Sequence, residues 1–516
     1  PCPSVVALIF IFAFVIVVLS LLYYYLTSSY GYWKNKSIPY VEGAIPGIGN
    51  ILPLISMKRN FADMFRDFYD QMPQHSMIGV YNMREPTLMV CEPELVKTVL
   101  LKNFQHFANN NFKLDPELDP LLAANPFFTD GERWKNSRQQ LTSSFTSGKL
   151  KYMYKSVNES CINMKEYLNK LIETSNGKAE LELKDLFSRY TAEVVASAAF
   201  GVEGENFKSH KDGPFREIGR LLFEPSFTKG FIDSMMFFIP IIGKIFKIGF
   251  MPAKADRFFR KVVKDVLKYR QEQGIQRPDF MQLMIQHKNS GVVDPGFDQQ
   301  FNDDIITSHA TTFFTDGYET SSITLSFVGY QLAAHSQVQD RVRKEVTNVI
   351  AKYGGLTYEA LQEMTYMDQV LNESMRLFPA FGTMMKMCTK EIELVGSDGI
   401  TCQVTSGTSI IIPISALQRD PAYWTDPEKF DPERFSEENK RALHKFVFLP
   451  FGEGPRNCPG MRMAMLQMKA AIATIIQSYI WEVSPRTIEP IQLDPNYFMS
   501  AAKGGLWNFR KFYVRN

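Results

Sequence analysis

The chain has 516 residues, 45% of them hydrophobic, and a formal net charge of +2. A charge this close to zero produces no field that would favour nucleic acid as a partner. The hydrophobic content is sufficient for a large buried core. The six cysteines are widely spread, without a C-x-x-C pair or zinc-like spacing, so they favour a reducing compartment over a disulfide framework.

Residues 5–26 are uncharged and strongly apolar, and a helix of that length rises about 33 Å, enough to span a bilayer. The alternative is a cleaved signal peptide, but this stretch is longer than a signal-peptide core. Lys34 and Lys36 follow it, which predicts a cytosol-facing body. We therefore predict a membrane anchor over 1–30, a Pro/Gly-rich hinge over 31–50 and a single domain over 51–516.

The following segments predict a helix over 60–69, a β-hairpin over 77–90 that breaks at Glu85-Pro86, and a short helix over 93–101. Residues 104–128 are irregular. Most of 150–300 is predicted to be helical. Within it, the apolar stretch 235–250 is broken by Pro and Gly and is too short to cross a bilayer. It either dips into the bilayer surface or belongs to the buried core.

One long helix is predicted over 301–335, and its middle reads Thr-Asp-Gly-Tyr-Glu-Thr-Ser from Thr315 to Ser321. Gly317 permits either a close approach or a local opening. Glu319 and Thr320 place an acid beside an alcohol, a pair suited to proton transfer. Taken alone, the pair is more simply a solvated turn.

Smaller patterns accompany this helix. Trp134 and Arg138 stand four residues apart, on one helix face, and Glu373 and Arg376 form an i,i+3 pair in a helix within 356–377. A strand is predicted over 407–413 and a hairpin turn over 497–505. Each of these patterns is common by chance.

The most distinctive stretch is the glycine-rich loop 448–460, which contains Cys458 and precedes an apolar helical stripe. Its glycines leave room for a flat, bulky group against bare backbone. Arg456 offers a planar positive fork to an anion. A helix beginning at Cys458 would favour a thiolate. Without these neighbours, Cys458 would be read as a small buried hydrophobe and the loop as a tight turn.

The pattern Phe-x-x-Gly-x-x-x-Cys-x-Gly, from Phe451 to Gly460, closely resembles the haem-binding signature of the cytochrome P450 family. The resemblance implies a mainly α fold with a smaller β portion, a bound haem b (iron protoporphyrin IX) and Cys458 as the axial ligand of the iron. Pro459 lacks an N–H donor, which either strengthens electron donation by the sulfur or merely suits a first helical turn. The implied cofactor-binding residues are Trp134, Arg138, Lys386, Phe451, Arg456, Cys458 and Gly460.

Residues 315–320 resemble the oxygen-activation motif of the same family, with Asp316 where a small residue is usual. That carboxylate could perturb the proton relay, bind a basic substrate or face away. Glu319 and Thr320 are the implied catalytic residues that deliver protons. The implied structural triad is Glu373, Arg376 and Arg434. The implied substrate contacts are Phe107, Phe112, Leu121, Leu122, Phe127, Phe313, Asp316, Phe381, Phe498 and Met499.

The implied reaction inserts one oxygen atom from O2 into a lipophilic small molecule. The sequence has no dinucleotide fingerprint, Walker loop or iron–sulfur cysteine cluster, so electrons must come from a partner. We expect NADPH–cytochrome P450 reductase, with cytochrome b5 as a second donor. The expected docking charges are Arg133, Lys135, Lys445, Arg462 and Lys469.

The motifs are most similar to insect microsomal members that clear foreign compounds such as plant toxins or insecticides, which implies location in the endoplasmic reticulum membrane. An endogenous hormone or fatty-acid hydroxylase is one alternative. A family member that rearranges peroxides is disfavoured by the intact Glu319-Thr320 pair. An alternative of another class is a non-catalytic haem-binding or electron-carrier protein.

Overall fold

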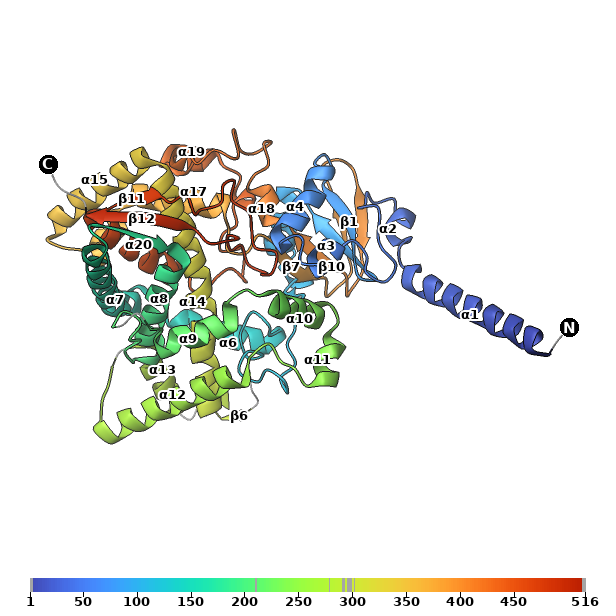
Figure 1. Cartoon of the computed structure of the whole chain (residues 1–516), viewed down its shortest axis with the longest axis horizontal. Helices are drawn as coiled ribbons and strands as arrows, with labels where there is room; N and C mark the ends of the chain where they lie inside the picture. The colour runs from blue at the N-terminus through green and yellow to red at the C-terminus, as the bar shows by residue number, and fades with distance from the viewer. Residues whose placement is uncertain are drawn as a thin grey trace.

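The structure is a computed structural model that describes residues 3–208, 211–277, 279–289, 293–294, 299–300 and 302–512. Helix α1 (Pro3–Thr27) projects from the body as a separate rod (Figure 1). Residues 7–27 are long and apolar enough to cross a membrane, and none of them is buried against the body. The predicted N-terminal helix is therefore present, and its length and composition fit a membrane span.

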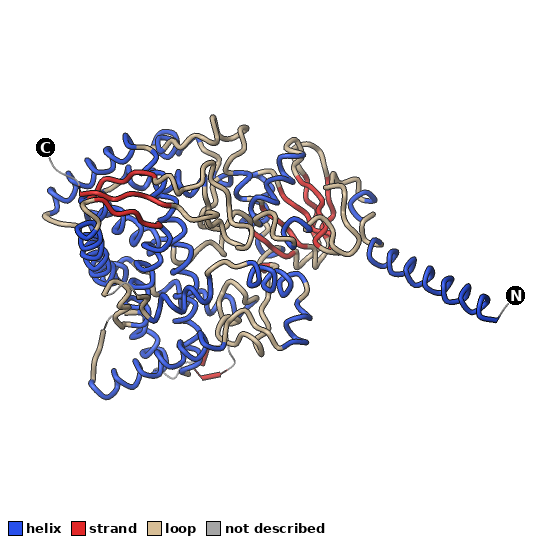
Figure 2. Tube along the Cα trace, in the orientation of Figure 1, coloured by secondary structure: helices blue, strands red, loops and turns tan. Residues whose placement is uncertain are grey.

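Helices form the bulk of the body, and the larger strands gather in two separate regions, as Figure 2 shows. The fold is mainly α with a smaller β portion, as predicted. The helices after α1 are α2 (Tyr32–Asn35), α3 (Leu52–Ile55), α4 (Phe61–Gln71), α5 (Pro93–Lys97), α6 (Gly131–Ser143), α7 (Ser147–Thr174), α8 (Leu183–Val195), α9 (Pro214–Phe223), α10 (Phe227–Phe238), α11 (Pro240–Phe246), α12 (Ala253–Gln273), α13 (Phe280–Asn289), α14 (Asp303–Ala334), α15 (Ser336–Tyr353), α16 (Tyr358–Glu363), α17 (Thr365–Leu377), α18 (Ile414–Leu417), α19 (Glu437–Ala442) and α20 (Met461–Ser478). The strands are β1 (Met77–Asn82), β2 (Glu85–Val90), β3 (Asn109–Asn110), β4 (Lys178–Glu182), β5 (Val293–Asp294), β6 (Gln299–Gln300), β7 (Met384–Met387), β8 (Ile392–Val395), β9 (Thr401–Val404), β10 (Ser409–Ile412), β11 (Tyr479–Val483) and β12 (Trp507–Phe512).

The largest sheet has the strand order β1-β2-β10-β7-β3 and lies toward α1. β1 and β2 form the predicted antiparallel hairpin, and β10 continues the sheet parallel to β2. The predicted break at Glu85-Pro86 is wrong. The turn falls two residues earlier, at Met83-Arg84, because Met83 adopts a φ of 53° and Glu85 already pairs with Asn82. The strand predicted over 407–413 is present as β10.

The Pro/Gly-rich segment 31–50 packs onto this sheet. The backbone N–H of Val41 donates to the Gly79 carbonyl at 2.9 Å, and the Gly79 N–H donates to the Pro39 carbonyl at 2.7 Å. Trp33 is buried over Gly79, where an added Cβ would lie 2.3 Å from the indole ring. The segment is thus attached to the body by hydrogen bonds and a buried aromatic ring.

Helix α14 runs through the middle of the helical region (Figure 1) and packs against α8, α12, α17 and α20. The side chain of Asn302 caps it by accepting the Ile305 N–H at 3.0 Å. It matches the helix predicted over 301–335 to within two residues at each end, although Phe301 lies outside the described residues. Most of the helix is buried on all sides, as its apolar composition requires.

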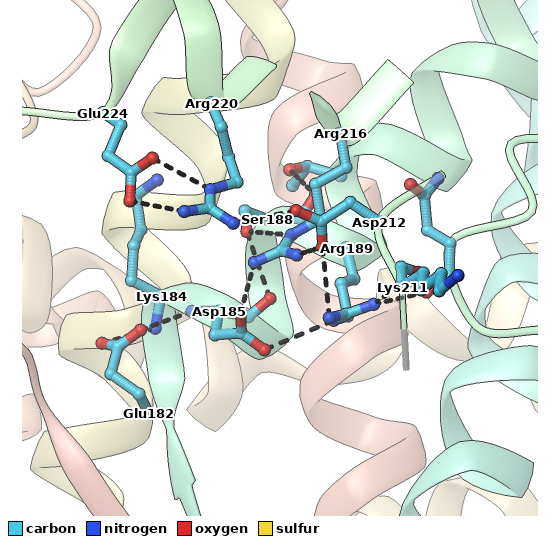
Figure 3. A network of polar contacts seen from close by, with 12 residues as sticks. Glu182, Lys184, Asp185, Ser188, Arg189, Lys211, Asp212, Arg216, Arg220 and Glu224 are labelled. Carbon is cyan, nitrogen blue, oxygen red and sulfur yellow. Dashed lines mark hydrogen bonds and ion pairs between the residues drawn. The ribbon is translucent and has the colours of Figure 1, made fainter. Parts of the chain in front are cut away.

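Helices α8 and α9 are joined by the ion network drawn in Figure 3. Arg216 of α9 is buried, pairs with Asp185 of α8 and donates to the Ser188 hydroxyl at 3.2 Å. Asp212, just before α9, receives Arg189 at 3.2 Å. This network holds α9 against α8, which in turn packs along α14.

Two further predictions changed in detail. The helical segment over 356–377 divides into α16 and α17 at Met364. The hairpin turn over 497–505 is held by an isolated bridge between Leu493 and Ala502, so its tip is formed by residues 494–501. The apolar stretch 235–250 forms the end of α10 and α11, and Ile241 and Ile245 are 55% and 66% exposed, so the buried-core alternative is wrong.

Candidate active site

The glycine-rich loop folds back on itself before α20. The Cys458 N–H donates to the Phe451 carbonyl at 2.8 Å. Gly454 has a φ of 78°, and a Cβ there would lie 2.0 Å from the Leu100 carbonyl oxygen, so only glycine fits. α20 begins at Met461 with Gly460 as its N-cap, so the prediction that Cys458 begins the helix is wrong by three residues.

The thiol of Cys458 nevertheless uses the N-terminus of α20. The backbone N–H groups of Gly460 and Met461 hydrogen-bond to the sulfur, and both lower the thiol pKa. Burial outweighs them and raises the pKa of Cys458 to about 11, and the charge of Asp316 adds to that rise. Asp316 is therefore close enough for its charge to raise the pKa of the thiol, so the two side chains border one space. In this environment the thiolate is stabilised by binding a metal cation.

Two arginines lie beside the thiol. Arg138 of α6 donates to the backbone and side-chain oxygens of Asn457, the latter at 2.6 Å. Arg456 lies 4.5 Å from the ring centroid of Trp134 and donates to the Thr129 carbonyl at 2.7 Å. Its side chain is buried, and its Nε has no hydrogen-bond partner among the described residues. A buried donor without an acceptor indicates a place for an anion.

Lys386 of β7 completes this cluster of positive charge. It is buried, it donates to Asn110 at 2.8 Å, and burial together with the nearby Arg456 lowers its pKa to about 7. Among the residues that the structure describes, Asp130 is the one carboxylate paired with Arg456, at 3.7 Å, and it also accepts Lys113 at 2.7 Å. The cluster thus carries more positive than negative charge, as a site for two carboxylates would.

The middle of α14 opens on the opposite side of this space. Asp316 is exposed and Thr320 is partly exposed, whereas residues 311–314 before them and Ser321 after them are buried. Burial by surrounding protein nevertheless raises the pKa of Asp316 to about 6, so these side chains face an enclosed space rather than bulk solvent. A Cβ on Gly317 would meet only Val195 at 3.6 Å, so this glycine is not required by a close approach.

The structure separates the predicted acid–alcohol pair. The Thr320 hydroxyl donates to the Asp316 carbonyl oxygen at 2.7 Å, at the open side of the helix. Glu319 is buried on another side, where it accepts Lys184 at 2.7 Å and the Tyr497 hydroxyl at 3.0 Å. Successive helix positions differ by about 100°, which places the two side chains in different surroundings.

The predicted triad comes together. Arg376 donates twice to Glu373, at 2.7 and 2.8 Å, and Arg434 approaches the same carboxylate at 3.4 Å. Both Glu373 and Arg376 are 0% exposed. Arg376 also donates to the Gln418 carbonyl at 2.9 Å, and the side chain of Gln418 accepts the N–H of Leu449 at the start of the Cys458 loop. The triad therefore supports that loop from behind.

The predicted substrate contacts fall into groups. Phe381 and Phe498 are exposed with their ring centroids 6.1 Å apart, because the Ser500 N–H donates to the Ala380 carbonyl and joins their loops. Phe112 packs against Phe237 of α10 at 4.8 Å. Phe127 is exposed and Leu122 is half-buried, whereas four others are buried in the core: Phe107, Leu121, Phe313 and Met499.

Three polar partners were not predicted from the sequence. Asn125 donates to Asp316 at 2.9 Å across 191 residues of chain, and Lys184 and Tyr497 hold Glu319. No spacing relates these residues to the motifs of α14. Only the tertiary fold brings them together.

These features fit one kind of group. A thiol, an excess of buried positive charge and an opened helix lie around one space, which suits a flat, dianionic macrocycle with a metal at its centre. The fold and the site define the class of haem–thiolate proteins.

Comparisons with known proteins agree. The model of the family "Cytochrome P450" matches residues 39–509. The chain is 33% identical to cytochrome P450 9e2 of Blattella germanica over 503 residues, covering 93% of this chain and 94% of that protein. It is 32% identical to cytochrome P450 6j1 of the same species, covering 95% of each chain. It is also 32% identical to probable cytochrome P450 9f2 of Drosophila melanogaster, covering 96% of this chain and 98% of that one. The chain belongs to the cytochrome P450 family and is a monooxygenase.

Proposed function

We propose that the protein oxidises lipophilic foreign compounds at the membrane of the endoplasmic reticulum, with electrons supplied from NADPH by a flavin-containing reductase. The observation that supports this substrate class is an exposed apolar surface on α10 and α11. It adjoins Phe237, which contacts Phe112 in the irregular segment 104–128. The reaction inserts one oxygen atom into the substrate and releases the other as water.

The haem would be held by residues already in position. Cys458 would ligate the iron, and Arg138, Arg456 and Lys386 would pair with the propionates, with Trp134 beneath the Arg456 guanidinium. Haem with a thiolate ligand supplies the activation of O2. An anionic propionate beside Lys386 would keep that amine protonated, because an opposite charge raises the pKa that burial lowers.

Proton delivery would use Thr320 and Glu319 at different moments. Thr320 Oγ1 is on the open side of α14, where it can accept a hydrogen bond from the space, and it can donate one there once its proton leaves the Asp316 carbonyl. Glu319 is held by Lys184 and Tyr497, so its carboxylate must leave that pair before it can carry a proton toward Thr320. Lys184 is partly exposed, which gives the pair a connection to solvent.

The exposed apolar surface has a route to the interior. It consists of Phe227, Phe231, Ile232, Ile241, Ile245, Phe246 and Ile248. Next to it, Phe237 of α10 contacts Phe112 of the loop 104–130. α10 also contacts α3, in the part of the body that lies near α1. A compound dissolved in the bilayer would therefore meet aromatic side chains along this route.

The reductase would dock on the Cys458 side of the molecule. A surface cavity of about 380 Å³ lies there, lined in part by Phe448, Met461, Met465, Lys440 and Arg462. The predicted docking charge Lys469 lines the inner wall of this cavity, where it is 4% exposed and donates to Asp368 at 2.9 Å, so its charge is already paired within the protein. Arg133, Lys135, Lys445 and Arg462 are exposed.

The proposed function is tested by reconstituting the full chain with the reductase in vesicles and measuring NADPH-dependent oxidation of a panel of foreign lipophilic compounds, steroids and fatty acids. We expect several foreign compounds to be oxidised. Oxidation confined to one endogenous steroid or fatty acid would contradict the proposal, as would absence of oxidation by haem-loaded, reducible protein.

Two matched variants test the entry surface and the docking surface. Ile241→Glu with Ile245→Glu should raise KM for membrane-dissolved substrates, whereas Tyr152→Glu, an equally exposed change on α7, should not. Lys440→Glu with Arg462→Glu should raise the reductase concentration needed for half-maximal rate, whereas Lys254→Glu on α12 should not. If a variant and its control change KM, or the reductase concentration needed, to the same extent, the corresponding surface is wrongly assigned.

A further inference from the structure

Asp316 is the one carboxylate of α14 that faces the enclosed space, and one of its two oxygens already accepts hydrogen bonds from the protein. Its Oδ1 accepts the Asn125 amide at 2.9 Å and the Thr315 hydroxyl at 3.1 Å. Its Oδ2 has no hydrogen-bond partner among the described residues, and its side chain is accessible. One oxygen is therefore fixed in place while the other is free to accept a donor from a bound molecule.

The fixed half is oriented by Asn125. This residue is buried, and its own Oδ1 accepts the Phe127 N–H at 2.8 Å. That bond turns the NH2 end of the amide toward Asp316. An amide donor directed at a carboxylate favours its ionised form, and it lowers the pKa that burial raises. The loop 104–130 thus positions an anion in the space.

No cation of the protein compensates this charge. Among the described residues, no Lys or Arg lies within ion-pair distance of Asp316. A buried carboxylate without a counter-charge is costly, and folded proteins normally pair or neutralise such a group. Glu319, three residues along the same helix, follows that rule by pairing with Lys184 at 2.7 Å. Asp316 is therefore left to take up a proton or to pair with a cation that a bound molecule brings.

We propose that Asp316, oriented by Asn125, binds the protonated nitrogen of lipophilic amine substrates. The proposal rests on the proposed function, since it names the substrate class of the same space. Leu122 and Phe127 flank Asn125 in that loop and are not fully buried, so they would supply apolar contacts, while the carboxylate would supply one charge-assisted hydrogen bond. Because Thr320 lies one turn along the same open side, carbons next to the bound nitrogen would be the ones presented for oxidation.

The test compares two ligands of nearly equal shape, a long-chain N,N-dimethylalkylamine and the hydrocarbon in which CH replaces the nitrogen. Dissociation constants are measured by equilibrium dialysis with the haem-loaded full chain. Wild type should bind the amine more tightly, and in Asp316→Asn the ratio of the two constants should fall about tenfold or more, the usual value of a hydrogen bond to a charge. Asp304→Asn, at the exposed start of α14, is the matched control.

Several outcomes decide the proposal. Equal affinity of wild type for both ligands overturns it, even if the Asp316→Asn protein fails to load haem. Equal weakening of both ligands in Asp316→Asn also overturns it, because that change would be structural. Asp316→Glu, which keeps the charge, should retain part of the preference. If neither ligand binds wild type, both the proposed function and the amine-binding role of Asp316 are contradicted. If both ligands bind equally, only the amine-binding role is contradicted.

Discussion

The two carboxylates in the middle of α14 have opposite environments. Glu319 is buried against α8 and the C-terminal loop, where Lys184 and Tyr497 satisfy it. Asp316 faces the enclosed space with neutral partners only, Asn125 and Thr315. Glu319 is held by donors of the protein itself, which it must leave before it can carry a proton, whereas Asp316 is available to a ligand. In this helix the protein supplies a counter-charge to Glu319 but supplies none to Asp316.

Removal of a fully compensated carboxylate should have the largest effect. Glu373→Gln leaves Arg376 buried with an uncompensated charge, so we expect a loss of about 3–5 kcal/mol in the free energy of unfolding and a poor yield of haem-loaded protein. Chemical denaturation measures the loss. Glu363→Gln, at an exposed carboxylate that pairs with Lys352 and accepts the Tyr353 hydroxyl, should cost far less. Similar losses for both would remove the distinction between buried and exposed pairs.

Removal of the counter-charge of Glu319 should have the next largest effect. Lys184→Met leaves that carboxylate buried with Tyr497 alone, and we expect a loss of about 2 kcal/mol in unfolding free energy, reduced from the fully buried case because Lys184 is partly exposed. Lys178→Met, which breaks an exposed pair with Glu482, is the control. A loss no greater than that of the control would show that Glu319 does not depend on Lys184.

The hydrogen bond from the C-terminal loop should contribute less. Tyr497→Phe removes the hydroxyl that donates to Glu319 at 3.0 Å, and we expect about 1 kcal/mol of destabilisation. The same variant in the Lys184→Met background should cost more, because Glu319 then has no donor from either residue. Strict additivity in this double-mutant cycle would mean that the two donors act independently.

Removal of Asp316, the uncompensated carboxylate, should have the smallest effect on the free energy of unfolding, and this change should be stabilising at neutral pH. Burial raises the pKa of Asp316 from its usual 3.8 to about 6, so the folded state holds that proton to higher pH than the unfolded state does. Stability contributed by this group therefore falls as pH rises from about 4 to 6. Asp316→Asn should be more stable than wild type above pH 6, by about 1 kcal/mol given the group's accessibility, and equal to it below pH 4. Thermal unfolding of the ligand-free, haem-loaded proteins across this range measures the difference, and a variant less stable than wild type at pH 7 would contradict it.

The sequence predicted those parts of the molecule in which local pattern determines structure. The apolar stripe identified α20, the length of one uninterrupted stretch identified α14, and short β-rich runs identified the β1–β2 hairpin. The glycine-rich loop around Cys458 was recognisable because its backbone needs glycine where it meets Leu100. The i,i+3 pair of Glu373 and Arg376 was also visible, since both lie on one helix.

Contacts between distant segments could not be predicted in this way. Their neighbouring positions in the sequence suggested that Glu319 and Thr320 act side by side. In the structure, α8 and the C-terminal loop hold Glu319 away from the open side of the helix. The orientation of Asp316 depends on Asn125, in a loop without regular periodicity. Lys469 appeared as a surface charge, although it is buried and donates to Asp368 of α17.

The central claim is that Cys458 places a thiolate on a haem iron, and the carbon monoxide difference spectrum of the reduced full chain tests it most directly. We expect the far-red-shifted Soret band of a thiolate-ligated haem in wild type, and its loss in Cys458→Ser. The band typical of histidine-ligated haem in freshly prepared, folded wild type, or folded protein that takes up no haem, would contradict the account.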